Sequence, residues 1–87
     1  MHIVWDEPKR TANLVKHGYD FADLDLDFFA EAVMRHARYP RRFAFGWFGG
    51  DFIAVVYERL GTEALAVISM RPANSKERLI YEQDQGI

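Results

Sequence analysis

Apolar side chains alternate with small ones across the second half of this chain, and that alternation constrains its fold more than any other feature. Phe43, Phe45 and Trp47 are separated by single small residues. Because successive side chains of a strand point to opposite faces, this spacing predicts a half-buried strand. Gly49-Gly50 follows, and paired glycines favour a tight hairpin turn because that turn needs positive φ. The unbroken apolar run 52–57 then predicts a central strand.

A third strand and a closing helix are predicted further along. Residues 65–71 alternate again, and Pro72 predicts the end of that strand because proline has no N–H for a ladder bond. Asn74 is followed three residues later by Glu77, which is the spacing of a capping box. The sequence therefore predicts an antiparallel meander and then a C-terminal helix.

The N-terminal segment predicts a short strand and a helix. Residues 2–5 are β-type, and Asp6 stands where an N-cap would. Gly18 fits the left-handed residue that closes a helix over 7–17. The helix is weakly amphipathic, with Ala12, Val15 and Leu14 on its apolar face. Its other face carries Lys9, Asn13 and Lys16, with His17 beside them.

A second helix is predicted from Asp20, which resembles another N-cap. Phe21, Leu24 and Phe28 form its apolar stripe. Segment 33–41 is ambiguous, because Pro40 confines any strand there to an edge or a loop. The elements together predict an α+β domain spanning residues 1–87, with an antiparallel three- to four-stranded sheet.

Composition and charge narrow the function. The 87 residues include no cysteine, which fits a reducing cytoplasm, and neither a leader nor a membrane span is expected from the apolar runs. Net charge is −2, which by itself argues mildly against nucleic-acid binding, because such binding depends on a basic surface. The charges are segregated, however. Segment 20–31 is acidic and segment 35–42 is arginine-rich, which predicts either two solvated faces or two faces for different partners.

Metal chemistry has little support in the sequence. His2, His17 and His36 lie in different predicted elements. Asp23, Asp25 and Asp27 lack the glycine and distal glutamate of a calcium loop, so we expect them on the solvated side of a helix. No metal site and no cofactor are predicted.

Acid, base and phosphate-binding groups remain as candidates. They are Lys9, Lys16, His17, Glu58, Arg59, Arg71, Glu77, Arg78 and Tyr81. Arg71 follows an apolar strand, where a scaffold can hold its guanidinium rigidly for a phosphate. The structural alternative is a strand-end salt bridge from Arg71 to a glutamate such as Glu77.

Two blocks of residues resemble the BrnT family, the toxin component of type II toxin–antitoxin systems. The first block holds Trp5, Asp6, Lys9, Asn13, Lys16, His17, Gly18 and Phe21. The second holds Ile68, Ser69, Arg71, Ala73, Glu77, Arg78 and Tyr81. Both blocks occur in order and together span nearly the whole chain.

The resemblance implies a RelE-like fold and a metal-independent endoribonuclease that attacks phosphate with the ribose 2′-OH. It also implies a ribbon-helix-helix antitoxin similar to BrnA, contact with DNA only through that antitoxin, and a dimer or a heterotetramer with it. By position, Arg71 would stabilise the phosphate charge, with Arg78 or Lys16 assisting. Glu58 or His17 would be the acid–base group. Lys9, Lys16, Arg59 and Tyr81 would bind RNA.

The chain departs from the family pattern at three places. The family often has a basic residue where this chain has Ala66, and it usually has a small residue where this chain has Met70. The region after the second helix is arginine-rich here. Two alternatives therefore stay open beside the ribonuclease. One is a catalytically weak relative that acts as an antitoxin-binding corepressor. The other is a small structural domain of unrelated role.

Overall fold

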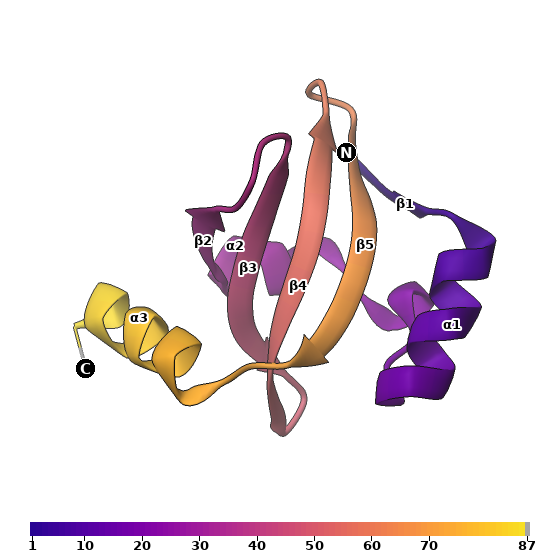
Figure 1. The fold of residues 1–87 in the computed structure, drawn as a ribbon. Coiled ribbons are helices and arrows are strands. Elements are labelled where there is room, and N and C mark those ends of the chain that lie inside the picture. The colour runs from indigo at the N-terminus through magenta and orange to yellow at the C-terminus, as the bar shows by residue number, and fades with distance from the viewer. Residues whose placement is uncertain (87) are drawn as a thin grey trace.

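The computed structural model describes residues 1–86 and shows one five-stranded sheet with three α-helices (Figure 1). The α+β fold predicted from the sequence is confirmed. The elements are β1 (His2–Trp5), α1 (Glu7–His17), the 3₁₀ turn η1 (Phe21–Asp23), α2 (Leu26–Glu31), β2 (Val33–His36), β3 (Arg41–Phe48), β4 (Asp51–Leu60), β5 (Ala64–Pro72) and α3 (Ser75–Gln85).

The meander lies at the centre of the sheet, in the order β1-β5-β4-β3-β2. Strands β3 and β4 form the predicted hairpin, in which Phe48 pairs with Asp51 across Gly49-Gly50. Gly49 has a φ of 59°, a backbone conformation that a side chain would strain. The central position of β4 agrees with its unbroken apolar run, because both of its edges are paired and Ile53, Ala54 and Val55 are completely buried.

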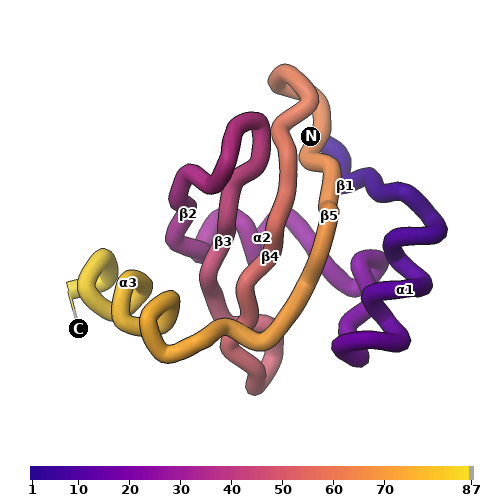
Figure 2. The backbone as a smooth tube through the Cα atoms, in the orientation of Figure 1, coloured from indigo at the N-terminus to yellow at the C-terminus, as the bar shows by residue number. Residues whose placement is uncertain are grey.

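The sheet has more strands than the three or four expected. β1 pairs in parallel with β5, from His2 opposite Ala64 to Trp5 opposite Val67. β2 pairs antiparallel with β3 and forms the other edge, which agrees with the restriction that Pro40 imposes on segment 33–41. Figure 2 shows the backbone of β2 beside β3 and that of β1 beside β5, at the two edges of the sheet.

The expected second helix is divided into two pieces. The Asp20 carboxylate accepts the Ala22 N–H and begins η1, which ends at Leu24 in extended backbone. The Asp25 carboxylate then accepts the Phe28 N–H and begins α2. A continuous helix from Asp20 was therefore wrong, because a second capping aspartate restarts the helix five residues later.

The core lies on one face of the sheet. Phe21, Leu24, Phe28 and Phe29 pack there against inward-facing side chains of β3, β4 and β5. Tyr57 and Ile53 on β4 are almost completely buried. In residues 1–86, every helix is too short or too polar to cross a membrane.

Both predicted caps of α1 are present. Asp6 accepts the Lys9 N–H, and Gly18 closes the helix with a φ of 77°. The apolar face assigned from the sequence is nevertheless wrong as a packing face, since Val15 is 89% exposed and Leu14 is 39% exposed. The polar side of α1 faces the sheet instead, and Asn13 on that side is buried.

Candidate functional site

Asn13 fixes helix α1 against the sheet. Its amide Nδ2 donates to the Tyr19 carbonyl at 3.1 Å, and its Oδ1 accepts the Met70 N–H at 3.0 Å. Strand β1 covers the edge of β5 only from Ala64 to Val67. Asn13 therefore satisfies a backbone group on the part of β5 that lies beyond β1, which explains why a polar helix face is turned inward.

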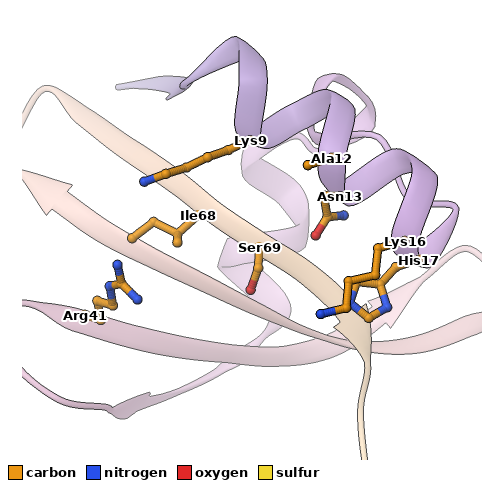
Figure 3. A pocket seen from close by; sticks show the side chains of 8 residues that line it. All are labelled: Lys9, Ala12, Asn13, Lys16, His17, Arg41, Ile68 and Ser69. Atoms are coloured by element: carbon orange, nitrogen blue, oxygen red, sulfur yellow. The ribbon is translucent and has the colours of Figure 1, made fainter.

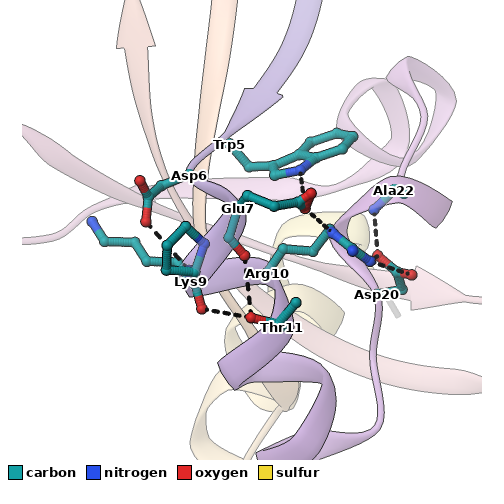
Figure 4. Close-up of polar contacts among 9 residues, drawn as sticks. Trp5, Asp6, Glu7, Lys9, Arg10, Thr11, Asp20 and Ala22 are labelled. Atoms are coloured by element: carbon teal, nitrogen blue, oxygen red, sulfur yellow. Dashed lines mark hydrogen bonds and ion pairs between the residues drawn. The ribbon is translucent and has the colours of Figure 1, made fainter.

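A second set of contacts holds the start of α1 (Figure 4). Trp5 Nε1 donates to Glu7, and Arg10 bonds both Glu7 and Asp20. The hydrogen bond from Arg10 lowers the pKa of Glu7, and the Ala22 N–H, followed by Arg10, lowers the pKa of Asp20. These contacts tie β1, α1 and η1 to one another, so the side chains of α1 project from a fixed frame.

The inward side of α1 and the sheet enclose a groove of about 290 Å³ (Figure 3). Its lining is Lys9, Ala12, Asn13, Lys16 and His17 from α1, Ile68 and Ser69 from β5, and Arg41 from β3. Lys9, Lys16 and Arg41 are cations, and no lining residue is acidic. We call this space the α1 groove. Its charge suits a ligand that carries phosphate.

A β-bulge decides which β5 side chains reach the open face, the sheet face opposite the core. Val56 pairs with Ser69, whereas the next residue, Tyr57, pairs with Val67, so Ile68 is the extra residue. Simple alternation would put Ser69 on the same face as buried Val67. The bulge reverses the alternation, so Met70 enters the core while Ser69 and Arg71 face outward.

The strand register arranges the open face in rows. From the tip of the β4–β5 hairpin downward in Figure 1, the rows are Arg41–Glu58–Ala66, Phe43–Val56–Ser69, Phe45–Ala54–Arg71 and Trp47–Phe52. Adjacent rows are about 7 Å apart, since each spans two residues of a strand. Glu58 and Arg71 each lie one row from Ser69, on opposite sides of it.

Glu58 borders the α1 groove through Arg41. The Glu58 carboxylate lies 3.8 Å from Arg41 Nε, and both side chains are substantially exposed. Such a pair contributes little to stability, about 0–1 kcal/mol, so either partner can exchange its contact for a ligand at small cost. The structure thus brings four predicted residues close to one groove, namely Lys9, Lys16, His17 and Glu58.

Arg71 is held by Glu77. Its guanidinium donates to both carboxylate oxygens at 2.7 Å and lies 5.9 Å from the ring centroid of Phe43. The Arg71 hydrogen bonds lower the pKa of Glu77, and the same pairing raises the pKa of Arg71. Glu77 also completes the predicted capping box of α3 with Asn74. The salt-bridge alternative is therefore confirmed, and it leaves part of Arg71 exposed to a ligand.

Arg78 and Tyr81 lie at the far end of the open face. Arg78 stacks 4.9 Å from the Trp47 ring centroid, and Tyr81 packs edge-on against Phe52 at 5.0 Å. These contacts dock α3 on the last row. The structure does not bring either residue to the α1 groove.

Arg59 also lies outside the α1 groove. It pairs across the ladder with Leu65 and lines a hollow beside Phe29 and Tyr57 on the core side of the sheet. Its neighbour Glu58 points to the open face, as alternation requires.

Sequence reasoning missed Arg41 and the orientation of Ser69. Arg41 lies two residues before Phe43 in β3, so it shares the strand face of Phe43, Phe45 and Trp47. Alternation alone could therefore have placed Arg41 on the open face. Nothing in the sequence marks the bulge at Ile68. Within residues 1–86, no group of three His, Cys, Asp or Glu side chains is placed to hold a metal ion.

The fold and the α1 groove define a small α+β protein with a cationic site between a helix and the open face of its sheet. Residues 5–77 match the family model described as "Ribonuclease toxin, BrnT, of type II toxin-antitoxin system". The chain belongs to the BrnT family of ribonuclease toxins, as the resemblance in its sequence implied. A type II toxin–antitoxin system includes an antitoxin partner for its toxin.

A solved structure supports the same assignment. The chain is 50% identical to the Brucella abortus ribonuclease toxin BrnT, whose crystal structure was determined at 1.1 Å, with a TM-score of 0.82. The match covers 86% of this chain and 99% of that one. Comparison with curated proteins gives no significant match.

Proposed function

We propose that this protein is a toxin that arrests growth by cutting RNA, principally messenger RNA, without a metal ion. The observation that carries this proposal is the α1 groove, which Lys9, Lys16 and Arg41 line together with Ser69. The two candidates for the general acid and base, His17 and Glu58, lie in or next to this groove. Three cations in one groove can hold the phosphates that flank a scissile bond. Residues 1–87 would act as one toxin domain in the cytoplasm, where messenger RNA is found.

The reaction we propose is transesterification. A base removes the proton from a ribose 2′-OH, and the oxygen attacks the adjacent phosphorus while the bond to the 5′-oxygen breaks. An acid protonates the departing 5′-oxygen, which leaves a 2′,3′-cyclic phosphate and a 5′-OH. Glu58 and His17 are the candidates for these two roles, because His17 lines the α1 groove near Ser69, and Glu58 lies 3.8 Å from Arg41 at the other end of that groove.

Cations would stabilise the extra negative charge of the phosphorane. Arg71 faces the same side of the sheet as Ser69, one row away, and the Glu77 pair holds its guanidinium in a defined orientation. Lys16 and Arg41 would act from the two ends of the α1 groove. Arg78 is farther away and, together with Tyr81, would contact RNA that continues across the open face toward α3.

The partner we propose is a ribbon-helix-helix antitoxin similar to BrnA. It would cover the toxin in a dimeric or heterotetrameric complex, and DNA would be contacted only by the antitoxin. This rests on membership of a toxin–antitoxin family. Co-purification with the product of the neighbouring gene would identify the partner.

A second function is favoured by one observation. Arg71 is engaged in a close ion pair with Glu77, which would compete with a substrate phosphate and lower the catalytic strength of the site. A weak enzyme of this kind would act as a corepressor that binds the antitoxin and modulates its affinity for DNA.

Expression of the isolated chain in a bacterial host separates the two functions. We expect wild-type protein to arrest growth and co-expressed antitoxin to restore it. Arg71→Ala should abolish arrest, whereas Val15→Ala, a change at a position 89% exposed on the far side of α1, should leave arrest intact. Harmless expression of folded wild-type protein would contradict the toxin function and favour the corepressor.

A further inference from the structure

A second cationic hollow of about 320 Å³ lies at the end of the sheet where β3 begins and β4 ends. It is lined by His36, Ala37, Tyr39, Pro40, Arg41, Arg42 and Arg59. Three arginines and a histidine from β2, β3 and β4 converge there, and no lining residue is acidic. We call this space the arginine hollow.

Two of its arginines lack an acidic partner among the described residues. In residues 1–86, neither Arg42 nor Arg59 forms an ion pair, whereas Arg41 has only the contact with Glu58 at 3.8 Å. Like charges brought together at one place repel one another. A concentration of unpaired positive charge is therefore most stable when an anionic ligand neutralises it.

The arginine hollow is joined to the α1 groove by one residue. Arg41 lines both spaces. The cations therefore continue from Lys16 and Lys9 on α1, through Arg41 on the open face, and then around the end of the sheet to Arg42 and Arg59 on its core side. A chain of phosphates that follows this line would meet positive charge along its whole length, as single-stranded nucleic acid does in its binding grooves.

An exposed aromatic ring accompanies these charges. Tyr39 is 93% exposed and lines the hollow beside the arginines. Nucleic-acid bases stack on such rings, and a basic groove with an aromatic platform is typical of single-strand binding. An acidic peptide would use the arginines but would have no comparable use for the ring.

We propose that the arginine hollow binds the RNA segment adjoining the one held in the α1 groove, with Arg42 and Arg59 contacting its phosphates and Tyr39 stacking on a base. The inference rests on the proposed function, because it assumes that the α1 groove holds RNA. It assigns Arg59 an RNA contact away from the reacting bond. It also gives a role to the arginine-rich segment 35–42.

Binding of fully 2′-O-methylated RNA tests the proposal, since the methyl group blocks attack by the 2′-oxygen. Oligonucleotides of about 4 and about 12 nucleotides are compared by fluorescence anisotropy at several salt concentrations. We expect wild-type protein to bind the longer RNA more tightly and with a steeper salt dependence. The double change Arg42→Gln and Arg59→Gln should reduce the slope of log K against log salt by about 1.4 for the longer RNA, because each single-strand phosphate contact contributes about 0.7.

Two further variants sharpen the test. Arg59→Gln alone changes an exposed side chain and should lower the slope by about 0.7 even if the double variant folds poorly. Arg38 lies between β2 and β3, like Tyr39, but does not line the arginine hollow. Arg38→Gln therefore removes a nearby charge and should keep the wild-type slope. An equal loss in Arg38→Gln would show diffuse attraction and overturn the proposal.

The remaining outcomes distinguish a failure of the arginine hollow as an RNA site from a failure of the proposed ribonuclease function. If wild-type protein binds the longer RNA and the Arg59→Gln slope is unchanged, the hollow is not an RNA site, whereas the proposed function stands. If the same variant instead weakens binding of the purified antitoxin, the hollow belongs to that partner and the inference is wrong. If wild-type protein binds neither RNA, both the inference and the proposed function fail.

Discussion

Arg71→Ala is expected to lower the rate of RNA cleavage about 10²–10³-fold, which is the usual effect of removing one group that stabilises developing negative charge. Arg71 is placed for this by the bulge at Ile68, which turns it to the open face one row from Ser69. Its guanidinium donates two hydrogen bonds of 2.7 Å to the Glu77 carboxylate, which hold it in place. Single-turnover cleavage of a labelled RNA measures the effect on the chemical step.

Arg71→Lys is the matched variant, because it keeps the charge but loses the paired N–H groups. We expect it to recover part of the rate. Since Arg71→Ala also leaves Glu77 without its partner, urea unfolding must show that the variant is folded at the assay temperature. A folded Arg71→Ala protein that cleaves at the wild-type rate would contradict the catalytic role and leave only the structural salt bridge.

Asn13→Leu is expected to lower the free energy of unfolding by about 2–4 kcal/mol. Leucine has the same number of side-chain heavy atoms as asparagine and branches at the same carbon, but it leaves the Met70 N–H and the Tyr19 carbonyl without their hydrogen bonds. An unsatisfied buried backbone group costs about 1–3 kcal/mol. The Met70 N–H is buried and bears that cost, whereas the Tyr19 carbonyl is only part-buried and adds less. Urea denaturation followed by circular dichroism gives the value.

Val15→Ala is the control for Asn13→Leu on the same helix. Val15 is 89% exposed, so we expect a change within about 0.5 kcal/mol. Asn13→Leu should also reduce cleavage in protein that remains folded, because α1 carries Lys9 and Lys16 into the groove. A loss of stability below about 1 kcal/mol would show that α1 is held mainly by other contacts, such as those of Arg10.

The strands and helix ends could be predicted from the sequence because local rules determine them. Alternation gave β3, the hairpin glycines gave the turn to β4, and Asp6, Gly18 and Asn74 gave the caps that the structure confirms. The grouping of Lys9, Asn13 and Lys16 on one helix face was also correct, since it follows from helix geometry alone.

The direction in which that face points could not be predicted. Val15 and Leu14 predicted an apolar contact, but the open edge of β5 beyond β1 needs a hydrogen-bond partner, and Asn13 supplies it. This depends on the parallel pairing of β1 with β5, which links segments far apart in the sequence. The bulge at Ile68 and the pairing of Arg41 with Glu58 also depend on how separate strands align. The residues of the site could therefore be predicted from the sequence, but their positions relative to one another could not.

The most direct test of the central claim is cleavage of single-stranded RNA by the purified protein in excess EDTA. The account predicts cleavage that EDTA does not diminish, with 2′,3′-cyclic phosphate and 5′-OH ends on the products. Those ends require that the ribose 2′-oxygen is the nucleophile. Strict dependence on a divalent ion, or products that carry 5′-phosphate, would contradict the mechanism assigned to the α1 groove.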